Sequence, residues 1–198
     1  MEQEKEFTSQ ESLALITKMI TRARRDYLGT GLSALLWGSV ITFCSLVAFA
    51  TAYFKWSPAL NAVWLLTIVA AIVQGFIAVR EAKARRHKPY DQDLMGGIWI
   101  AFAIAVFMLS FIFNLYPSNG EPAIYLGLYG VPTFATGYAR RFRPMVIGGI
   151  ICWILALISL RIGYPYTLLC ITAGAVSAWF IPGLIIRKRY LKAKQQHV

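Results

Sequence analysis

Six long apolar runs take up most of this 198-residue sequence, and they constrain its fold more than any other feature. A helix needs roughly 20 apolar residues, at 1.5 Å of rise per residue, to cross the hydrocarbon core of a bilayer. Backbone polar groups find no water there, so the runs are expected to form helices. The sequence therefore predicts an all-α membrane protein with six transmembrane helices. The predicted spans are about 28–54, 59–79, 94–115, 123–139, 145–160 and 166–186.

The composition agrees with a surface that faces lipid. Hydrophobic residues make up 58% of the chain and charged residues only 15%, whereas a soluble domain carries about 25% charged residues. A chain of this length has too little polar sequence left to cover six apolar helices in water.

Positive charge is concentrated in four short clusters beside the apolar runs, and the alternate connections carry only Lys55 and Arg161. By the positive-inside rule the clusters are cytosolic, so both termini are predicted to lie in the cytosol. The net charge of +11 could also indicate nucleic-acid binding, but charges that flank spans favour anionic lipid headgroups as the partner. The clusters are Arg22, Arg24 and Arg25; Arg80, Lys83, Arg85, Arg86 and Lys88; Arg140, Arg141 and Arg143; and Arg187, Lys188, Arg189, Lys192 and Lys194.

The two terminal segments are expected to differ from the six spans. Residues 1–27 are predicted to form a cytosolic amphipathic segment whose helix starts at the capping box Thr8-Ser9-Gln10-Glu11. Leu13, Ile16 and Ile20 recur there at helical spacing beside basic residues. Such a helix either lies in the membrane interface or packs on the inner ends of the spans. Residues 187–198 are predicted to form a basic cytosolic tail.

The six spans resemble three copies of one helical hairpin of about 50 residues. Small residues followed by a bulky one open the odd spans, as in Gly96-Gly97-Ile98-Trp99 and in Gly148-Gly149-Ile150. Each copy has two spans, so all three copies share one orientation in the membrane, unlike the inverted repeats of many transporters.

Chemistry that an enzyme or a proton-coupled pump needs is missing from the apolar runs. No Asp, Glu, Lys, Arg or His lies in the middle of a predicted span, where such proteins usually place an ionisable group. The sequence therefore predicts a protein that is not an enzyme and has no cofactor or metal. His87, Asp91 and Asp93 share a predicted cytosolic loop, but their spacing is not that of a metal site. The three cysteines, Cys44, Cys152 and Cys170, are interpreted as packing residues.

Four residues within the spans are candidates for a kink or a binding pocket: Gln74, Pro132, Thr133 and Pro182. A proline frees a backbone carbonyl, which marks either a simple kink, the favoured interpretation here, or a broken helix at a substrate site. Gln74 and Thr133 occupy nearly equivalent repeat positions, where they either hydrogen-bond between helices or line a pocket.

Several stretches resemble a family of uncharacterised six-span bacterial inner-membrane proteins. They are ESLALITKMITRAR, LLWGSVITFC, YGVPTFATGYARRFRPMVIGGIICW and WFIPGLIIRKRY, and the resemblance covers nearly the whole chain. It implies a six-helix fold and an inner (plasma) membrane location, without an activity or functional residues.

Two functions remain. The leading hypothesis is a non-enzymatic accessory or regulatory subunit that acts through a protein partner in the membrane or cytosol. It follows from the missing catalytic groups and the basic cytosolic surface. The alternative is a small transporter or channel for a neutral or weakly polar solute, which follows from the repeated hairpins and Pro132.

Overall fold

The computed structural model describes residues 30–84, 90–118 and 120–195, and the regular elements in these ranges are all helical, which confirms the all-α prediction. The predicted amphipathic segment 1–27 lies outside the described residues. The elements are α2 (Leu32–Tyr53), the 3₁₀-helix η1 (Pro58–Leu65), α3 (Leu66–Ala84), α4 (Tyr90–Leu115), α5 (Glu121–Ala139), α6 (Arg143–Ser159), α7 (Thr167–Ala175), the π-helix η2 (Val176–Phe180) and α8 (Ile181–Gln195).

Four helices in the described ranges are long and apolar enough to cross a membrane, which indicates a membrane protein. Helix α6 is apolar but shorter. Tyr, Thr, Gly and Pro interrupt the apolar side chains of α5. These two helices coincide with the fourth and fifth predicted spans, whose crossing of the membrane stays a prediction. The four candidate spans are Leu32–Tyr53, Pro58–Lys83, Leu94–Leu115 and Thr167–Lys192.

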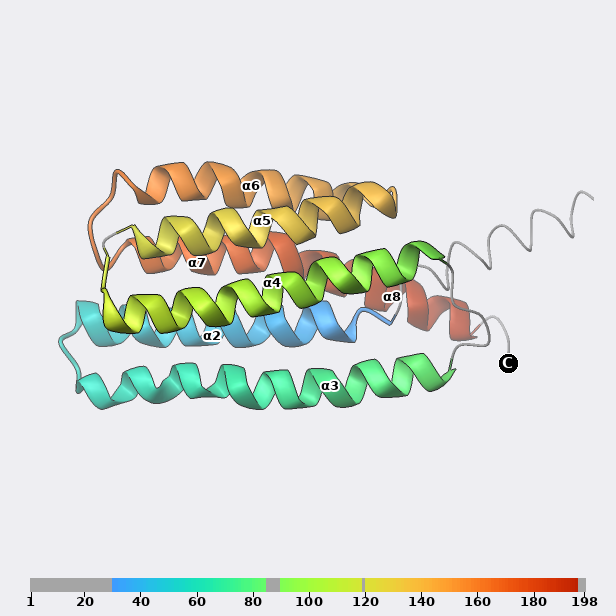
Figure 1. The fold of residues 1–198 in the computed structure, drawn as a ribbon, viewed down its shortest axis with the longest axis horizontal. Helices are drawn as coiled ribbons and strands as arrows, with labels where there is room; N and C mark the ends of the chain where they lie inside the picture. Colours follow the sequence, from blue (N-terminus) through green and yellow to red (C-terminus); the bar gives the residue numbers. More distant parts are fainter. Residues whose placement is uncertain (1–29, 85–89, 119, 196–198) are drawn as a thin grey trace, which may run out of the picture.

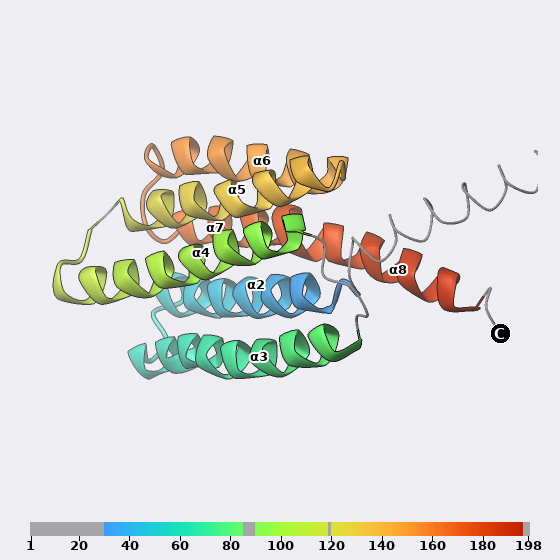
Figure 2. The same ribbon diagram turned by 45° about the vertical axis from the view of Figure 1, so that its right-hand side comes forward.

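Most of the helices lie side by side along the long axis of the molecule (Figures 1 and 2). Helix α5 packs most extensively on α6, and α2 packs on α7 and η2, so these elements form the centre. Helices α3 and α4 are peripheral, because α3 packs on α2 and η1 whereas α4 packs on α5. Only 6% of the most apolar stretch of each is buried, against 50% for the stretch that runs from α7 into α8. The closest packing therefore joins two different predicted hairpins, and the hairpin repeat stays a prediction.

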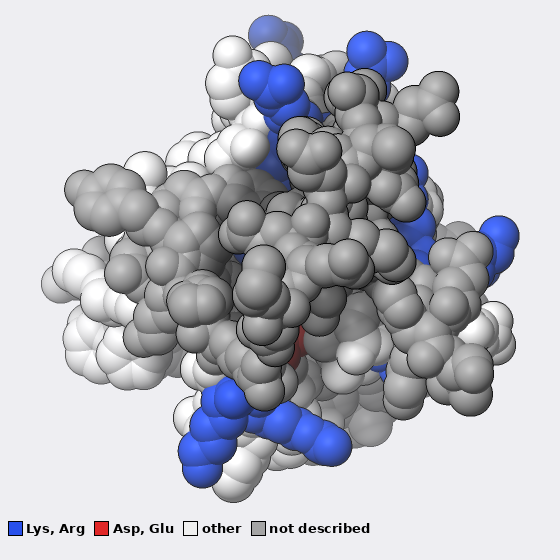
Figure 3. Space-filling view, turned by 90° about the vertical axis from the view of Figure 1, so that its right-hand side faces the viewer, with Lys and Arg blue, Asp and Glu red and all other residues white. Residues whose placement is uncertain are grey.

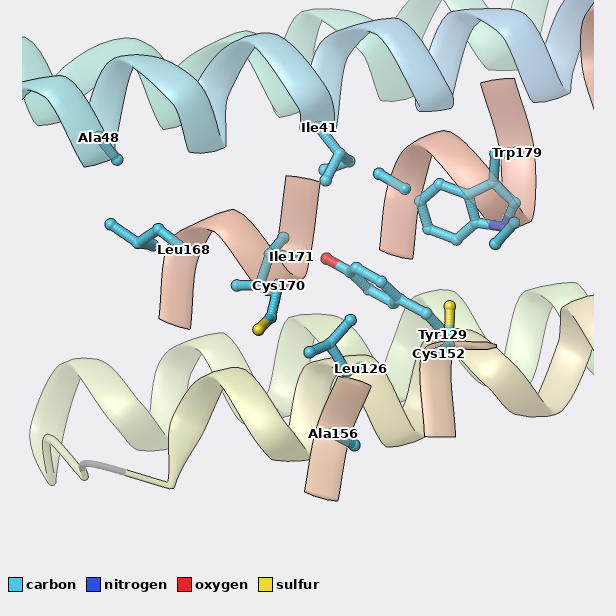
Figure 4. Packing of buried hydrophobic residues seen from close by; sticks show 12 residues of the cluster. Ile41, Ala48, Leu126, Tyr129, Cys152, Ala156, Leu168, Cys170, Ile171 and Trp179 are labelled. Carbon is cyan, nitrogen blue, oxygen red and sulfur yellow. The ribbon is translucent and has the colours of Figure 1, made fainter. Parts of the chain in front are cut away.

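The core lies where α2, α5, α6, α7 and η2 meet. The Tyr129 ring extends into the space between Ile41, Ile171 and Trp179 (Figure 4). Its centroid lies 4.7 Å from that of Trp179. The free thiols Cys44, Cys152 and Cys170 are buried, and Cys152 belongs to the same core as Tyr129.

Two glycines let neighbouring helices approach the backbone of η2. A Cβ atom on Gly38 of α2 would lie 2.6 Å from the Phe180 nitrogen, and one on Gly148 of α6 would lie 2.5 Å from the Ser177 oxygen. Both distances are shorter than a methyl group tolerates, so the packing of α2 and α6 on η2 requires glycine at these positions.

The widened turn of η2 comes directly before the proline of α8. Pro182 has no N–H, and its ring crowds the carbonyl four residues earlier, that of Ala178. A π-helix places hydrogen bonds at i→i+5 spacing, so the widened turn suits the helix that continues through Pro182. The same turn carries Trp179 into the core, where it is 3% exposed.

Three helix boundaries differ from the predicted loops and tail. Helix α4 begins at Tyr90, so Asp91 and Asp93 lie in its first turn, and Glu121 is the first residue of α5. The prediction that Asp91 and Asp93 lie in a loop is therefore wrong. Helix α8 continues to Gln195, so the basic residues after 186 extend a helix instead of following it. Acidic residues at helix N-termini and basic residues at C-termini complement the helix dipole, which favours longer helices than apolar runs alone predict.

Basic side chains gather at one end of the bundle, here called the basic end, which faces the viewer in Figure 3. The opposite end, here called the far end, holds the connections around Lys55, Ser118 and Arg161. This distribution agrees with the clustering of charge in the sequence. The exposed cations of the basic end are Arg80, Lys83, Arg141, Arg143, Lys188, Arg189 and Lys192.

A tight turn joins α5 to α6 at the basic end. Arg141 takes a left-handed backbone conformation with φ 48°. The Phe142 N–H donates to the Gly137 carbonyl at 2.8 Å, as in a Schellman ending. The turn buries Phe142 and leaves Arg141 exposed.

Candidate functional site

A cleft of about 2280 Å³ lies between α3 and α4 and is here called the α3–α4 cleft. Ligand pockets for drug-sized molecules usually have about 300–1,000 Å³, so this cleft suits a longer occupant. It exists because α3 packs on α2 whereas α4 packs on α5, which separates the two peripheral helices. The cleft runs from Thr30 and Ile186 at the basic end to Asn114 and Tyr164 at the far end.

The walls of the cleft are apolar and aromatic along most of its length. Several lining residues come from the core, including Tyr129 and Trp179, so the floor of the cleft is the surface of the core itself. The ring of Phe102 on α4 meets those of Tyr129 at 6.0 Å and of Trp179 at 6.2 Å. The main apolar lining residues are Trp37, Ile41, Ile68, Ala71, Trp99, Phe102, Phe107, Tyr129, Ile171 and Trp179.

Charged groups line the cleft only at its ends, among the residues that the structure describes. Glu81 and Arg140 lie at the basic end, and Glu121 and Arg161 lie at the far end. Each end therefore combines one acid with one base, and the cleft lacks the excess of cations found on the outside of the basic end. Burial raises the pKa of the Glu121 carboxyl above its ordinary value.

Polar side chains on the α3 side of the cleft join α3 to α2. The Gln74 amide nitrogen donates to the Ser33 hydroxyl at 3.0 Å. The Thr30 hydroxyl donates to the Glu81 carboxylate, closer to the basic end. Gln74 thus both hydrogen-bonds between helices and lines the cleft.

On the other side, two hydrogen bonds join α4 to α5. The Trp99 indole N–H donates to the Thr136 hydroxyl at 3.0 Å. The hydroxyls of Ser110 and Tyr125 lie 2.8 Å apart, nearer the far end. All four residues line the cleft, so the polar contacts of each wall run along that wall rather than across the opening.

Among the described residues, two side chains that line the cleft have a buried polar atom without a hydrogen-bond partner. These atoms are Oε1 of Gln74 and the hydroxyl oxygen of Thr167. Thr42 and Thr51 have similarly unpaired hydroxyls, but these residues do not line the cleft. Unpaired polar groups are costly where water is absent. Both atoms are buried, so an occupant of the cleft could pair with either of them only after its side chain rotates.

The other predicted pocket residues lie behind the cleft. Pro132 and Thr133 are fully buried in α5, and Pro182 is fully buried in α8. Thr133 donates to the Tyr129 carbonyl at 2.8 Å and accepts from the Trp179 indole N–H at 2.9 Å. Helix α5 continues without a break through Pro132. Of the four candidates, only Gln74 lines the cleft.

The structure describes some of the basic residues that were predicted to lie at the membrane interface. Arg140 is half-buried in the cleft wall. Arg187 stacks on Tyr190 at 5.5 Å, and Arg189 stacks on Phe142 at 5.4 Å. Arg141 and Lys188 are exposed. Arg22, Arg24, Arg25, Arg85 and Arg86 lie outside the described residues.

The sequence interpretation missed the tryptophans of the site. Trp99 lines the cleft and Trp153 does not, and neither is among the candidate residues from the sequence. Trp99 donates to Thr136, and Trp153 donates to the Gly127 carbonyl at 3.1 Å. An indole N–H inside an apolar run needs an acceptor, and this requirement was the available signal. It does not identify which threonine or carbonyl accepts.

The sequence spacing of His87, Asp91 and Asp93 does not indicate a metal site. His87 lies outside the described residues, as do the side chains of Asp91 and Asp93. Within the ranges that the structure covers, no group of three His, Cys, Asp or Glu residues is arranged to hold a metal ion.

No protein-family model, curated protein or solved structure matches this chain. The resemblance to the six-span inner-membrane family therefore stays a prediction, and the function is argued from the cleft.

Proposed function

We propose that this protein is a six-span membrane protein that binds a neutral or weakly polar, lipid-like molecule in the α3–α4 cleft, as a small transporter would. The cleft itself supports this proposal, because it is long and largely apolar. Between its two ends, no charged side chain among the described residues lines it. The proposal keeps the predicted orientation, with the basic end in the cytosol of the inner membrane.

The shape of the cleft supports an occupant with an acyl chain. With the helices crossing the bilayer, the opening between α3 and α4 faces sideways into the hydrocarbon layer. An acyl chain can then enter from the membrane and lie against Phe102 and Trp99, which replaces lipid–lipid contacts with contacts to flat aromatic rings. The balanced charges at each end favour a neutral molecule over an anion.

Photo-cross-linking tests this function directly. The full chain is reconstituted into phosphatidylcholine vesicles that contain a trace of a diazirine-labelled acyl lipid, and the labelled residues are mapped by mass spectrometry. Binding in the cleft predicts labels on Phe102, Tyr129 and Ile171, the last two of which are 6% and 4% exposed. Phe76 and Leu157 are 73% and 69% exposed away from the cleft, so they report general lipid contact. Labels confined to such outward residues would contradict the proposal.

The second candidate is the accessory or regulatory subunit, favoured by the large apolar side chains that α3 and α4 expose outside the cleft. Phe76 is the clearest example. A partner helix that covers this face would exclude lipid from it. Gentle extraction from native membranes, followed by mass spectrometry, distinguishes the two functions. A stoichiometric protein partner that protects Phe76 from the lipid probe supports the accessory function.

A further inference from the structure

The unpaired amide oxygen of Gln74 indicates the chemical class of the occupant. Its nitrogen is used by Ser33, and its oxygen has no partner. Gln74 lies within the candidate span Pro58–Lys83, closer to its basic end than to its far end, with apolar residues on both sides in the sequence. In a bilayer no water satisfies such an oxygen, so a donor from a molecule in the cleft would stabilise it.

The Thr167 hydroxyl, the second unpaired group in the cleft, depends less on an occupant for a hydrogen bond than the Gln74 oxygen does. The Thr167 hydroxyl both donates and accepts and can rotate toward any neighbouring acceptor, whereas an amide oxygen only accepts. The Oε1 atom is buried, so it reaches an occupant only when the amide rotates, which the broad terminal torsion of a glutamine allows. Gln74 is therefore the better anchor for a polar group.

The cleft residues beside Gln74 favour an uncharged anchor. The lining residues near it are apolar or bear hydroxyls, as Ala71 and Ser33 show, and the described charges lie toward the cleft ends. A carboxylate or phosphate beside Gln74 would lie in apolar surroundings and be poorly solvated, which is unfavourable. A hydroxyl group fits, because it can donate to the unpaired amide oxygen.

We infer that the occupant is an uncharged amphiphile with a free hydroxyl, of the long-chain alcohol class, and that its hydroxyl hydrogen-bonds to Gln74. Its chain lies along the aromatic wall formed by Trp99 and Phe102. This inference rests on the proposed function, since it requires that lipid-like molecules enter the α3–α4 cleft.

The test compares two diazirine probes with the same chain, a long-chain alcohol and its methyl ether, which accepts but does not donate. Both are applied to the full chain in phosphatidylcholine vesicles, and labelling of Phe102 and Ile171 is quantified. A hydrogen bond contributes about 0.5–1.5 kcal/mol, so the alcohol is expected to label the cleft about two- to tenfold more than the ether. Gln74→Leu should remove that preference and leave ether labelling unchanged, which also shows that the variant is folded.

Two further variants test whether the preference for the alcohol depends on Gln74. Thr42→Val deletes an unpaired buried hydroxyl outside the cleft and should keep the preference for the alcohol. Thr167→Val tests the other unpaired group of the cleft as the anchor. Equal labelling by alcohol and ether in the unmodified chain would overturn the inference while the proposed function stands. A preference lost in Thr167→Val but kept in Gln74→Leu would overturn it too. Absence of cleft labelling by either probe would instead contradict the proposed function.

Discussion

The indole nitrogen of Trp179 donates to the hydroxyl of Thr133 at 2.9 Å, although the two residues are 46 positions apart in the sequence. The Thr133 hydroxyl in turn donates to the Tyr129 carbonyl of its own helix. Tyr129 and Trp179 form part of the floor of the α3–α4 cleft. The hydrogen bond therefore fixes the aromatic surface that an occupant would touch.

Thr133→Val should destabilise the protein by roughly 1–2 kcal/mol, because it leaves a buried indole N–H without an acceptor. Unfolding by sodium dodecyl sulfate in mixed micelles, followed by circular dichroism, measures the change. Trp179→Phe and the double variant complete a double-mutant cycle. A coupling free energy near zero would show that this hydrogen bond does not contribute to stability.

Gly38→Ala should destabilise by about 1–3 kcal/mol, since the new Cβ would lie 2.6 Å from the backbone nitrogen of Phe180. Gly75→Ala is the matched control in α3, where no atom lies within 4 Å of the added Cβ. It should be neutral or stabilise by up to about 1 kcal/mol through helix propensity. Equal effects of the two substitutions in the same unfolding assay would contradict the close packing of α2 on η2.

Glu121 should make stability fall as pH rises through the range just above the ordinary pKa of a carboxyl. Burial raises its pKa in the folded state, so the folded protein binds a proton that the unfolded chain releases. The stabilisation from this proton is complete below the unfolded pKa and is lost as pH rises through the folded pKa. Glu121→Gln should therefore gain stability relative to the unmodified chain between acid and neutral pH. A difference that does not change with pH would contradict burial of the carboxyl.

The predicted six-span topology is testable with single cysteines at the two ends. Ser57→Cys and Ser118→Cys at the far end should react with an impermeant maleimide added to intact cells. Lys83→Cys and Arg141→Cys at the basic end should react only after permeabilisation. All four positions are exposed, and the native thiols are buried, which keeps the background low. Labelling of Lys83→Cys in intact cells would contradict a cytosolic basic end.

The candidate site was only partly predictable. Gln74 was identified because an amide in an apolar run needs a partner, and the structure places it on the cleft. Pro132 gave an equally strong sequence signal, yet it is fully buried and away from the cleft. Sequence shows that a residue is unusual for its segment but not which way the helix turns it, since that depends on the neighbouring helices.

The sequence by itself determined the helices and the basic end. Helical hydrogen bonds form within a segment, so apolar runs of sufficient length define them without reference to the rest of the chain, and the clusters of Arg and Lys define one end. Only the tertiary structure decided that α5 packs most closely on α6 and that α3 and α4 stand apart. The packing of α5 on α6 uses the close approach of Gly149 to Gly130 and Phe134. Gly38 and Gly148 approach η2, and Trp179 donates to Thr133. Each of these joins residues far apart in the sequence, and together with the separation of α3 from α4 they give the cleft its shape.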